Sequence, residues 1–428
     1  MSRSGASAQE GALPMHTLIK NRTFLTLSTS NFFQTLGISF FNIILLMFAK
    51  SFDNAQLWVA LISISAVIPG VLSAVLGNVV NRFNYKAKSI IILTIIQAVM
   101  YLYMAVYMDH KYTWVIMMVI GVNLLSDIFG VLIGLLRYPI IQAHIEGDNR
   151  RQALGIMQSI AFFMQPLGQA AGVAYIGATG DYRMGSLINA ATFLISALIF
   201  VFNYKQVEIN PMTSVSDQPE PAQTSKEKTI SLKKVLALLT DATKIPGISL
   251  LASLMIFNGI SAGIDGVLNL YVLDHSDSFY FSFGVSIFLI TIASIAGQIV
   301  GSFWVNDFMK NYTMKKLLLI SAVLLILLFV VLALQMNFLL ILLLLFAMSY
   351  IIGKVNPKVA SDIMEKVDEK YLSPMMGTIS TVMTLATPVG SVALVAGYAG
   401  IGPTITLTIG IGFAAVSFLI LLFAKKID

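Results

Sequence analysis

Twelve long apolar segments, more than any other feature, determine what this chain can fold into. One of them, residues 317–334, reads LLLISAVLLILLFVVLAL and contains no charged residue. Such a run lacks the alternation of a transmembrane β-strand, and only helices or closed barrels satisfy the backbone inside a bilayer. Charged residues make up 11% of the chain, against about 25% in soluble domains. The sequence therefore predicts an all-α polytopic membrane protein.

Hydropathy places these segments in two sets of six. The first set covers residues 24–48, 57–80, 89–108, 114–136, 153–176 and 186–202, and the second covers 248–272, 279–305, 317–334, 338–353, 375–397 and 404–424. Most of these approach the roughly 20 residues that a helix needs to cross a bilayer. We therefore expect twelve transmembrane helices in two pseudo-symmetric six-helix bundles.

The polar stretch between the two sets predicts a linker. Its Pro, Ser, Glu and Lys content cannot support a packed core. Within it, residues 230–239 (ISLKKVLALL) place Lys233 and Lys234 beside apolar residues, as in a helix lying in the plane of the membrane surface. The expected organisation is an N-terminal segment 1–23, bundles 24–202 and 248–424, a linker 203–247 and a C-terminal segment 425–428.

Basic residues predict the orientation. If the N-terminus is cytoplasmic, the inner segments hold 24 of the 27 Lys and Arg, counting Arg137 because the fourth span is expected to end at residue 136. The outer loops keep Lys50, Lys111 and Arg183. By the positive-inside rule, both termini face the cytoplasm, and we expect a multi-pass protein of the plasma membrane.

The two halves share landmarks at matching places, which indicates an internal repeat. In the fifth and eleventh spans the series Gly155, Pro166, Gly168 and Gly377, Pro388, Gly390 have identical spacing, at an offset of 222 residues. Pro139 and Pro357 differ by 218. Polar residues of the first and seventh spans also correspond, with a slip at the third position: Asn31, Gln34, Ser39 and Asn42 against Asn258, Ser261, Asp265 and Asn269.

The loop after the second span carries a family resemblance. It reads GNVVNRFNYKAK from Gly77 to Lys88 and resembles the G-x-x-x-D-R-x-x-x-R/K signature of the major facilitator superfamily. The resemblance implies twelve helices, alternating access and a gate motif at Gly77, Asn81 and Arg82. Asn81 stands where the family has Asp, so it cannot form a charge-assisted pair with an Arg. Positive-inside anchoring is the alternative reading of Arg82 and its basic neighbours.

A second resemblance concerns the fifth span. Residues 165–172 (QPLGQAAG) resemble the Gly- and Pro-rich motif of antiporter branches of that superfamily. Together with the Ala- and Gln-rich stretch 148–158, the chain is most similar to the macrolide-efflux-like drug exporters. This resemblance implies export of drug-like molecules.

Polar residues inside the spans are the candidate site. Asp127 and Asp265 are acidic, and a charge in hydrocarbon is costly unless it faces protein or water, so both are candidates for proton coupling. The predicted cavity lining, on helix faces expected to meet centrally, consists of Asn31, Gln34, Ser39, Asn42, Gln158, Gln165, Gln169, Asn258, Ser261 and Asn269. Helix-to-helix hydrogen bonding is the alternative role for each of them.

These features predict a proton-coupled exporter of neutral or cationic amphiphiles. The spans as delimited hold no Lys or Arg to pair with an anionic cargo, and no nucleotide-binding G-x-x-x-x-G-K-[ST] motif occurs. A lipid or lysolipid flippase and a sugar-uptake protein remain alternatives. With no Cys and four scattered His, we expect no metal and no cofactor, no enzymatic activity, no nucleic-acid partner, and a monomer whose partners are its substrate, protons and the lipid bilayer.

Overall fold

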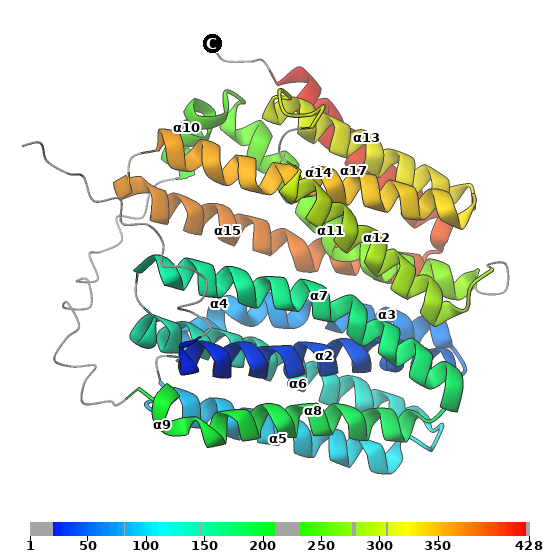
Figure 1. The fold of residues 1–428 in the computed structure, drawn as a ribbon. Helices are drawn as coiled ribbons and strands as arrows, with labels where there is room; N and C mark the ends of the chain where they lie inside the picture. Colours follow the sequence, from blue (N-terminus) through cyan, green and yellow to red (C-terminus); the bar gives the residue numbers. More distant parts are fainter. Residues whose placement is uncertain are drawn as a thin grey trace, which may run out of the picture. The chain divides into compact units, whose positions relative to one another are not determined.

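A computed structural model describes residues 20–80, 82–145, 147–209, 232–275, 280–304, 307–367 and 369–424. Within these ranges the regular structure is helical and contains no strand (Figure 1). Eleven of the helical spans are long and apolar enough to cross a membrane. The twelfth is α7 (Gly147–Thr179), which is 33 residues long but richer in polar residues. The predicted all-α, twelve-helix membrane fold is confirmed.

The helices follow the predicted spans closely. The first half consists of α2 (Arg22–Lys50), α3 (Ala55–Ser65), α4 (Ile68–Val80), α5 (Lys86–Tyr107), α6 (Thr113–His144), α7, α8 (Tyr182–Phe202) and the short α9 (Tyr204–Val207). The second half consists of α10 (Leu232–Thr243), α11 (Gly247–Asp274), α12 (Phe283–Phe303), α13 (Met314–Ala333), α14 (Phe338–Lys366), α15 (Glu369–Ser391), a π-helical turn (Val392–Ala396), α16 (Gly397–Gly400) and α17 (Pro403–Phe423).

The second span is divided between two helices. The sequence predicts one helix over 57–80, but α3 ends at Ser65 and α4 begins at Ile68. Pro69 lies at the start of α4 and has no N–H to donate, and its ring would clash with the carbonyl four residues earlier, at Ser65. The break therefore falls where a proline requires it.

The fourth span extends beyond its predicted end. Helix α6 continues to His144, so Arg137 lies inside the helix, where it is only 7% exposed. The prediction that Arg137 is an inner-loop residue is wrong, and so is the prediction that the spans hold no basic residue. Ile140 and Ile141, which follow Arg137, are buried and continue the apolar face of α6 past the charge. Without Arg137, the predicted inner segments hold 23 Lys and Arg and the outer loops hold 3.

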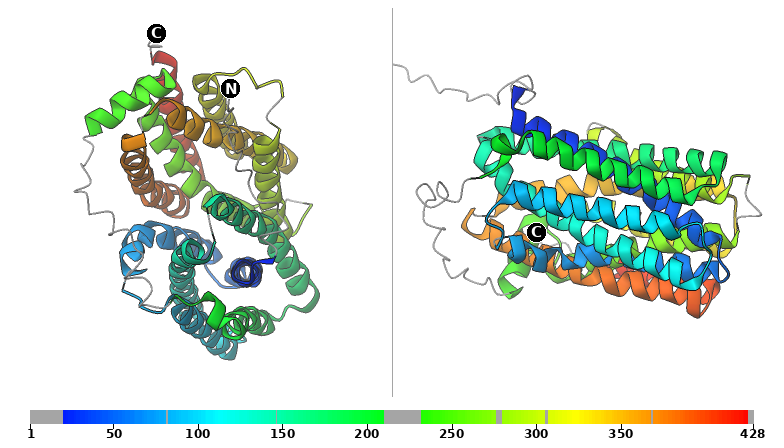
Figure 2. Two further views of the ribbon diagram at one scale, coloured as in Figure 1. Left: turned by 60° about the vertical axis from the view of Figure 1, so that its left-hand side comes forward. Right: turned by 90° about the horizontal axis from the view of Figure 1, so that it is seen from below.

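The chain divides into two compact units. Unit 1 comprises Met1–Asn42, Ser73–Asp109 and Leu125–Gln218, and unit 2 comprises Ile43–Leu72, His110–Leu124 and Pro219–Asp428. The division passes through α2 and α6, so each of these helices contributes residues to both units. The left view of Figure 2 shows α2 nearly end-on.

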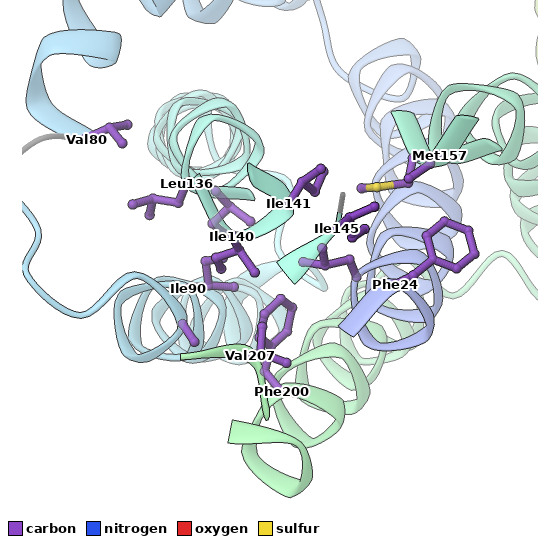
Figure 3. Close-up of a cluster of buried hydrophobic side chains, with 14 of the residues drawn as sticks. Phe24, Val80, Ile90, Leu136, Ile140, Ile141, Ile145, Met157, Phe200 and Val207 are labelled. Carbon is purple, nitrogen blue, oxygen red and sulfur yellow. The ribbon is translucent and has the colours of Figure 1, made fainter. Parts of the chain in front are cut away.

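The core of unit 1 joins six of its helices and α9. Figure 3 shows Phe24 of α2, Ile90 of α5, Ile140 of α6 and Phe200 of α8 among its buried side chains. At one end of this core, the carboxylate of Glu208 accepts hydrogen bonds from the backbone N–H groups of Ala87 and Lys88, at 3.2 and 2.9 Å. A carboxylate at a helix N-terminus satisfies free donors and complements the helix dipole, so Glu208 fixes the start of α5.

The core of unit 2 includes the predicted amphipathic helix. Val235 and Leu239 of α10 are buried in a cluster with residues of α11, α13, α14, α15 and α17, while Lys233 and Lys234 are exposed. A Cβ atom at Gly247 would lie 2.1 Å from the carbonyl oxygen of Leu236. Glycine at this position therefore permits α10 to turn directly into α11.

Equivalent contacts in the two units reveal the internal repeat. A Cβ atom at Gly168 of α7 would lie 2.6 Å from a backbone oxygen of α2, and one at Gly390 of α15 would lie 2.0 Å from a backbone oxygen of α11. The matched glycines thus permit the same close approach in both halves: the fifth span approaches the first, and the eleventh span approaches the seventh.

The matched asparagines form a second equivalent contact. Asn31 donates to the carbonyl oxygen of Met157 at 3.2 Å, and Asn258 donates to that of Met383 at 2.9 Å. The donors are 227 residues apart and the acceptors 226. The pattern of polar residues in the first and seventh spans is therefore a structural correspondence.

Candidate functional site

The predicted cavity residues of unit 1 lie mainly on α2. Gln34 and Ser39 are buried, and Asn31 and Asn42 are half-buried. Ser39 lies against the close approach of α7, because its Cβ is 2.8 Å from the position of a Cβ at Gly168. Ser39 is therefore part of a packed helix contact, whereas Asn31 and Gln34 belong to a polar cluster.

Arg137 is the centre of that cluster. Its Nη1 donates to Oδ1 of Asn31 at 2.5 Å, and its Nη2 donates to Oε1 of Gln34 at 2.6 Å. Gln34 in turn donates to Oγ1 of Thr94 at 3.3 Å, and Asn31 donates to Met157. The cluster thus joins α2, α5, α6 and α7 around one guanidinium. Sequence reasoning missed Arg137 because the charge itself was taken as the end of the span.

Asp127 lies on the same helix as Arg137, ten residues earlier, which is about 15 Å along the axis. Its side chain is half-buried and interacts electrostatically with Tyr101 of α5. The adjacent Ser126 accepts a hydrogen bond from Gln97 of α5, at 3.1 Å between Nε2 and Oγ. Asp127 therefore lies at a polar α5–α6 contact.

The glutamines of α7 differ in exposure. Gln158 and Gln165 are exposed, and Gln169 is half-buried. Oε1 of Gln169 is buried and accepts no hydrogen bond from the residues that the structure describes. Of the three predicted lining residues on this helix, Gln169 is thus the one that an additional donor would satisfy.

Unit 2 contains a cavity of about 280 Å³. Asn258 and Ser261 of α11, which the sequence predicted as cavity residues, both line it. The remaining walls come from α11, α13, α14 and α15 and consist of Leu254, Phe257, Leu318, Ser321, Leu325, Met348, Ile352, Val355 and Met383. The cavity is mostly apolar, with a few hydroxyl and amide groups.

The other two predicted residues of α11 lie further along the helix. Asn269 donates to Oγ of Ser63 in α3, at 3.3 Å, which makes it a helix-to-helix contact. Asp265 is exposed, and among the described residues it has no hydrogen-bond or ion-pair partner. Within that part of the chain, Asp265 therefore makes no helix-to-helix contact that would fix its carboxylate.

The predicted gate residues lie at the end of α4. Gly77 is inside the helix with open space beside it, and Arg82 is exposed in the turn that follows. Asn81 lies outside the described residues. A charged contact instead occurs after α12, where Lys354 pairs with Asp307 at 3.0 Å and Tyr350 donates a hydrogen bond to Asp307.

That contact is nearly buried, since the Lys354 and Asp307 side chains are 10% and 4% exposed. Sequence reasoning missed it because the tenth span was expected to end at residue 353, whereas α14 continues to Lys366 and places Lys354 inside a helix. The loop after the eighth span therefore supplies a carboxylate, that of Asp307, to an ion pair with α14. In the loop after the second span, the neutral side chain of Asn81 cannot form such a pair.

Comparisons with known proteins agree with this architecture. The family model described as Major Facilitator Superfamily matches residues 27–391. The solved structure of the POT family transporter PepTSo has 13% identity and a TM-score of 0.64, covering 94% of this chain and 96% of its own. The nucleoside transporter NupG has 16% identity and a TM-score of 0.65, covering 96% and 100%.

A structure of the peptide transporter POT in complex with sulfate has 13% identity and a TM-score of 0.61, covering 94% of both chains. At these identities the likeness concerns the fold. A comparison with curated proteins gives no match.

Proposed function

Since the chain belongs to the major facilitator superfamily, a family of membrane transporters, we propose that it exports amphiphilic small molecules in exchange for protons. In this proposal the bundles 24–202 and 248–424 alternate access to a central site, in the manner of transporters built from repeats. In the same proposal the protein is a monomer in the plasma membrane, and both of its termini lie in the cytoplasm.

Proton coupling is supported chiefly by Asp265. It lies in a transmembrane helix, is exposed and lacks a partner among the described residues. Ionisable residues within membrane spans are expensive and mark proton or ion pathways. A side chain that only assembled the bundle would be satisfied by a neighbouring helix, as Asn269 is by Ser63.

An amphiphilic cargo is supported by the cavity of unit 2. Its walls are mostly aliphatic and aromatic, and its polar groups are Asn258, Ser261 and Ser321. A sugar would need many more hydrogen-bonding partners than these, because each buried hydroxyl group left unpaired costs free energy. The lining therefore favours drug-like molecules over a sugar. The absence of basic residues from the spans no longer argues against anionic cargo, because Arg137 lies in α6.

The direct test uses the purified protein in liposomes. Ethidium, a lipophilic fluorescent cation, and an uncharged dye of similar size are loaded on one side, and a pH gradient is imposed. We expect each dye to move against its gradient only while the pH gradient persists, and movement to stop when nigericin and K⁺ collapse it. Dye movement that is unaffected by the pH gradient would contradict proton coupling. Movement of a short-chain fluorescent lysolipid alone would favour the flippase alternative.

A further inference from the structure

The geometry points to Arg137 as a binding site for the anionic group of the transported molecule, a carboxylate on an otherwise apolar organic anion. This inference rests on the proposed transport function and names a chemical class of cargo within it. It adds organic anions to the predicted neutral or cationic cargo; that prediction left anions out because the spans as delimited held no basic residue.

The charge of Arg137 is not neutralised within the described protein. The residue is only 7% exposed, and among the described residues no carboxylate lies within ion-pair distance of it. The nearest acidic residue on its own helix is Asp127, about three turns away. A buried ion without a counter-ion is unfavourable, so the site is stabilised when an anion enters it.

The hydrogen bonds of Arg137 leave a donor free. Nη1 and Nη2 each donate to a neutral amide oxygen, on Asn31 and Gln34. Nε is buried and has no partner among the described residues. Guanidinium has five N–H donors in a planar fork that matches a carboxylate. The amides therefore orient the fork without neutralising it.

The second half of the repeat shows that the helix contact does not need this arginine. Asn258 makes the same contact as Asn31: in each half, an asparagine of the first span donates a hydrogen bond to a carbonyl oxygen of the fifth span. The proline correspondence places Val355 at the position of Arg137, and Val355 lines the apolar cavity of unit 2. The same architecture is thus built with an apolar residue at that position, so a role in packing does not explain the charge.

Open space lies beside the turns of α6 that precede Arg137. In an α-helix the side chain leans toward the turn that precedes its Cα. On α6 that direction carries Gly134 and then Gly130, and a Cβ atom at either position would meet nothing within 4 Å. The face of α6 next to Arg137 is therefore open, with Asp127 beyond the two glycines.

The test measures binding of three probes that share one apolar scaffold: 4-butylbenzoate, 4-butylbenzamide and 4-butylbenzylammonium. Binding to the full-length purified protein is followed by calorimetry and by the ligand-induced rise in melting temperature. We expect the benzoate to bind roughly 10- to 100-fold more tightly than the amide, as a charge-assisted hydrogen bond implies.

Three variants separate a binding role from a structural one. R137Q removes the charge, and R137K keeps it without the fork. N31D leaves Arg137 in place and puts a carboxylate oxygen where Asn31 Oδ1 accepts from Nη1. The matched control is N337D, the same change at an exposed residue that caps α14 through Leu339 N at 2.8 Å.

R137Q and N31D should abolish the preference for benzoate while the amide still binds. R137K should keep part of it, and N337D should keep all of it. The inference is overturned if the wild type shows no preference for benzoate, or if N31D retains it. Proton-driven dye movement, measured in parallel, keeps the two proposals apart: lost coupling with intact benzoate selectivity refutes the exchange mechanism alone, and intact coupling without selectivity refutes the anion site alone.

Discussion

Individual polar residues of this protein form helix contacts, line a cavity or do both, and sequence alone does not separate these cases. Asn31 and Asn258 show the difficulty. Both were predicted as cavity residues, and both donate to a carbonyl oxygen of a neighbouring helix. Asn258 also lines a cavity. Polarity inside a span therefore identifies residues that need a partner, and only the structure shows whether protein supplies it.

Glycine substitutions on α7 test the close approach to α2. Gly168→Ala would place a Cβ 2.6 Å from the carbonyl oxygen of Leu36, and we expect a loss of about 1–3 kcal/mol of stability from overpacking. Gly155→Ala, on the same helix, meets nothing within 4 Å and should be neutral or stabilising, because Ala is the better helix former. Thermal unfolding in detergent measures both. Equal destabilisation by the two variants would refute the close approach.

Helices and their ends account for most of what the sequence predicted and for most of its errors. The twelve spans are recognisable because continuous apolar runs have few other solutions. The errors occur where a charge or a proline interrupts the pattern. Arg137 and Lys354 were each placed outside a helix that in fact continues past them, and Pro69 divides a span that was predicted as continuous. Hydropathy cannot show that residues elsewhere in the chain supply hydrogen-bond or ion-pair partners to a charged side chain inside a helix.

The ion pair after α12 provides a prediction at this scale. Asp307→Asn leaves Lys354 without its counter-ion in a nearly buried site, which should cost roughly 3–5 kcal/mol. Asp109→Asn breaks the exposed pair with Arg183 and should cost less than about 1 kcal/mol. Melting temperatures of the two variants give the comparison. A loss for Asp307→Asn no greater than for Asp109→Asn would show that the pair does not hold this loop to α14.

The loop after α4 provides a second prediction at this scale. Arg82→Ala should reduce dye transport far more than Lys88→Ala. The first change removes a predicted gate contact, whereas the second removes only one of several basic residues that anchor the loop. Both side chains are exposed, so their effects on stability should be small, and protein yield and melting temperature serve as controls. Transport rates that fall equally and slightly would leave positive-inside anchoring as the function of this loop.

At the scale of the whole molecule, the repeat was predictable from spacing, whereas its asymmetry was not. The Gly and Asn landmarks recur because both halves need the same close helix contacts. Arg137 and Asp265 have no equivalent in the other half, where Val355 and Ile38 stand. Residues that depart from the repeat are free of its packing constraints, and they are the residues to which we assign anion binding and proton coupling.

The orientation in the membrane that the basic residues predict has its own test. The chain has no native Cys, so single cysteines can be introduced without background. Cysteines at Asn84 and Ser225 should react with impermeant reagents only from the cytoplasmic side, and those at Asp109 and Ser276 only from outside. Labelling of Asn84 from outside would reverse the topology.

The most direct test of the account compares wild type with Asp265→Asn in liposomes. The variant keeps the shape of the side chain and one acceptor oxygen but cannot exchange a proton, and Asp109→Asn controls for loss of a carboxylate at the surface. Asp265→Asn should lose pH-driven accumulation of dye while substrate counterflow, which needs no proton, continues at a rate comparable with wild type. If it still concentrates dye with the pH dependence of the wild type, Asp265 does not carry the coupling proton.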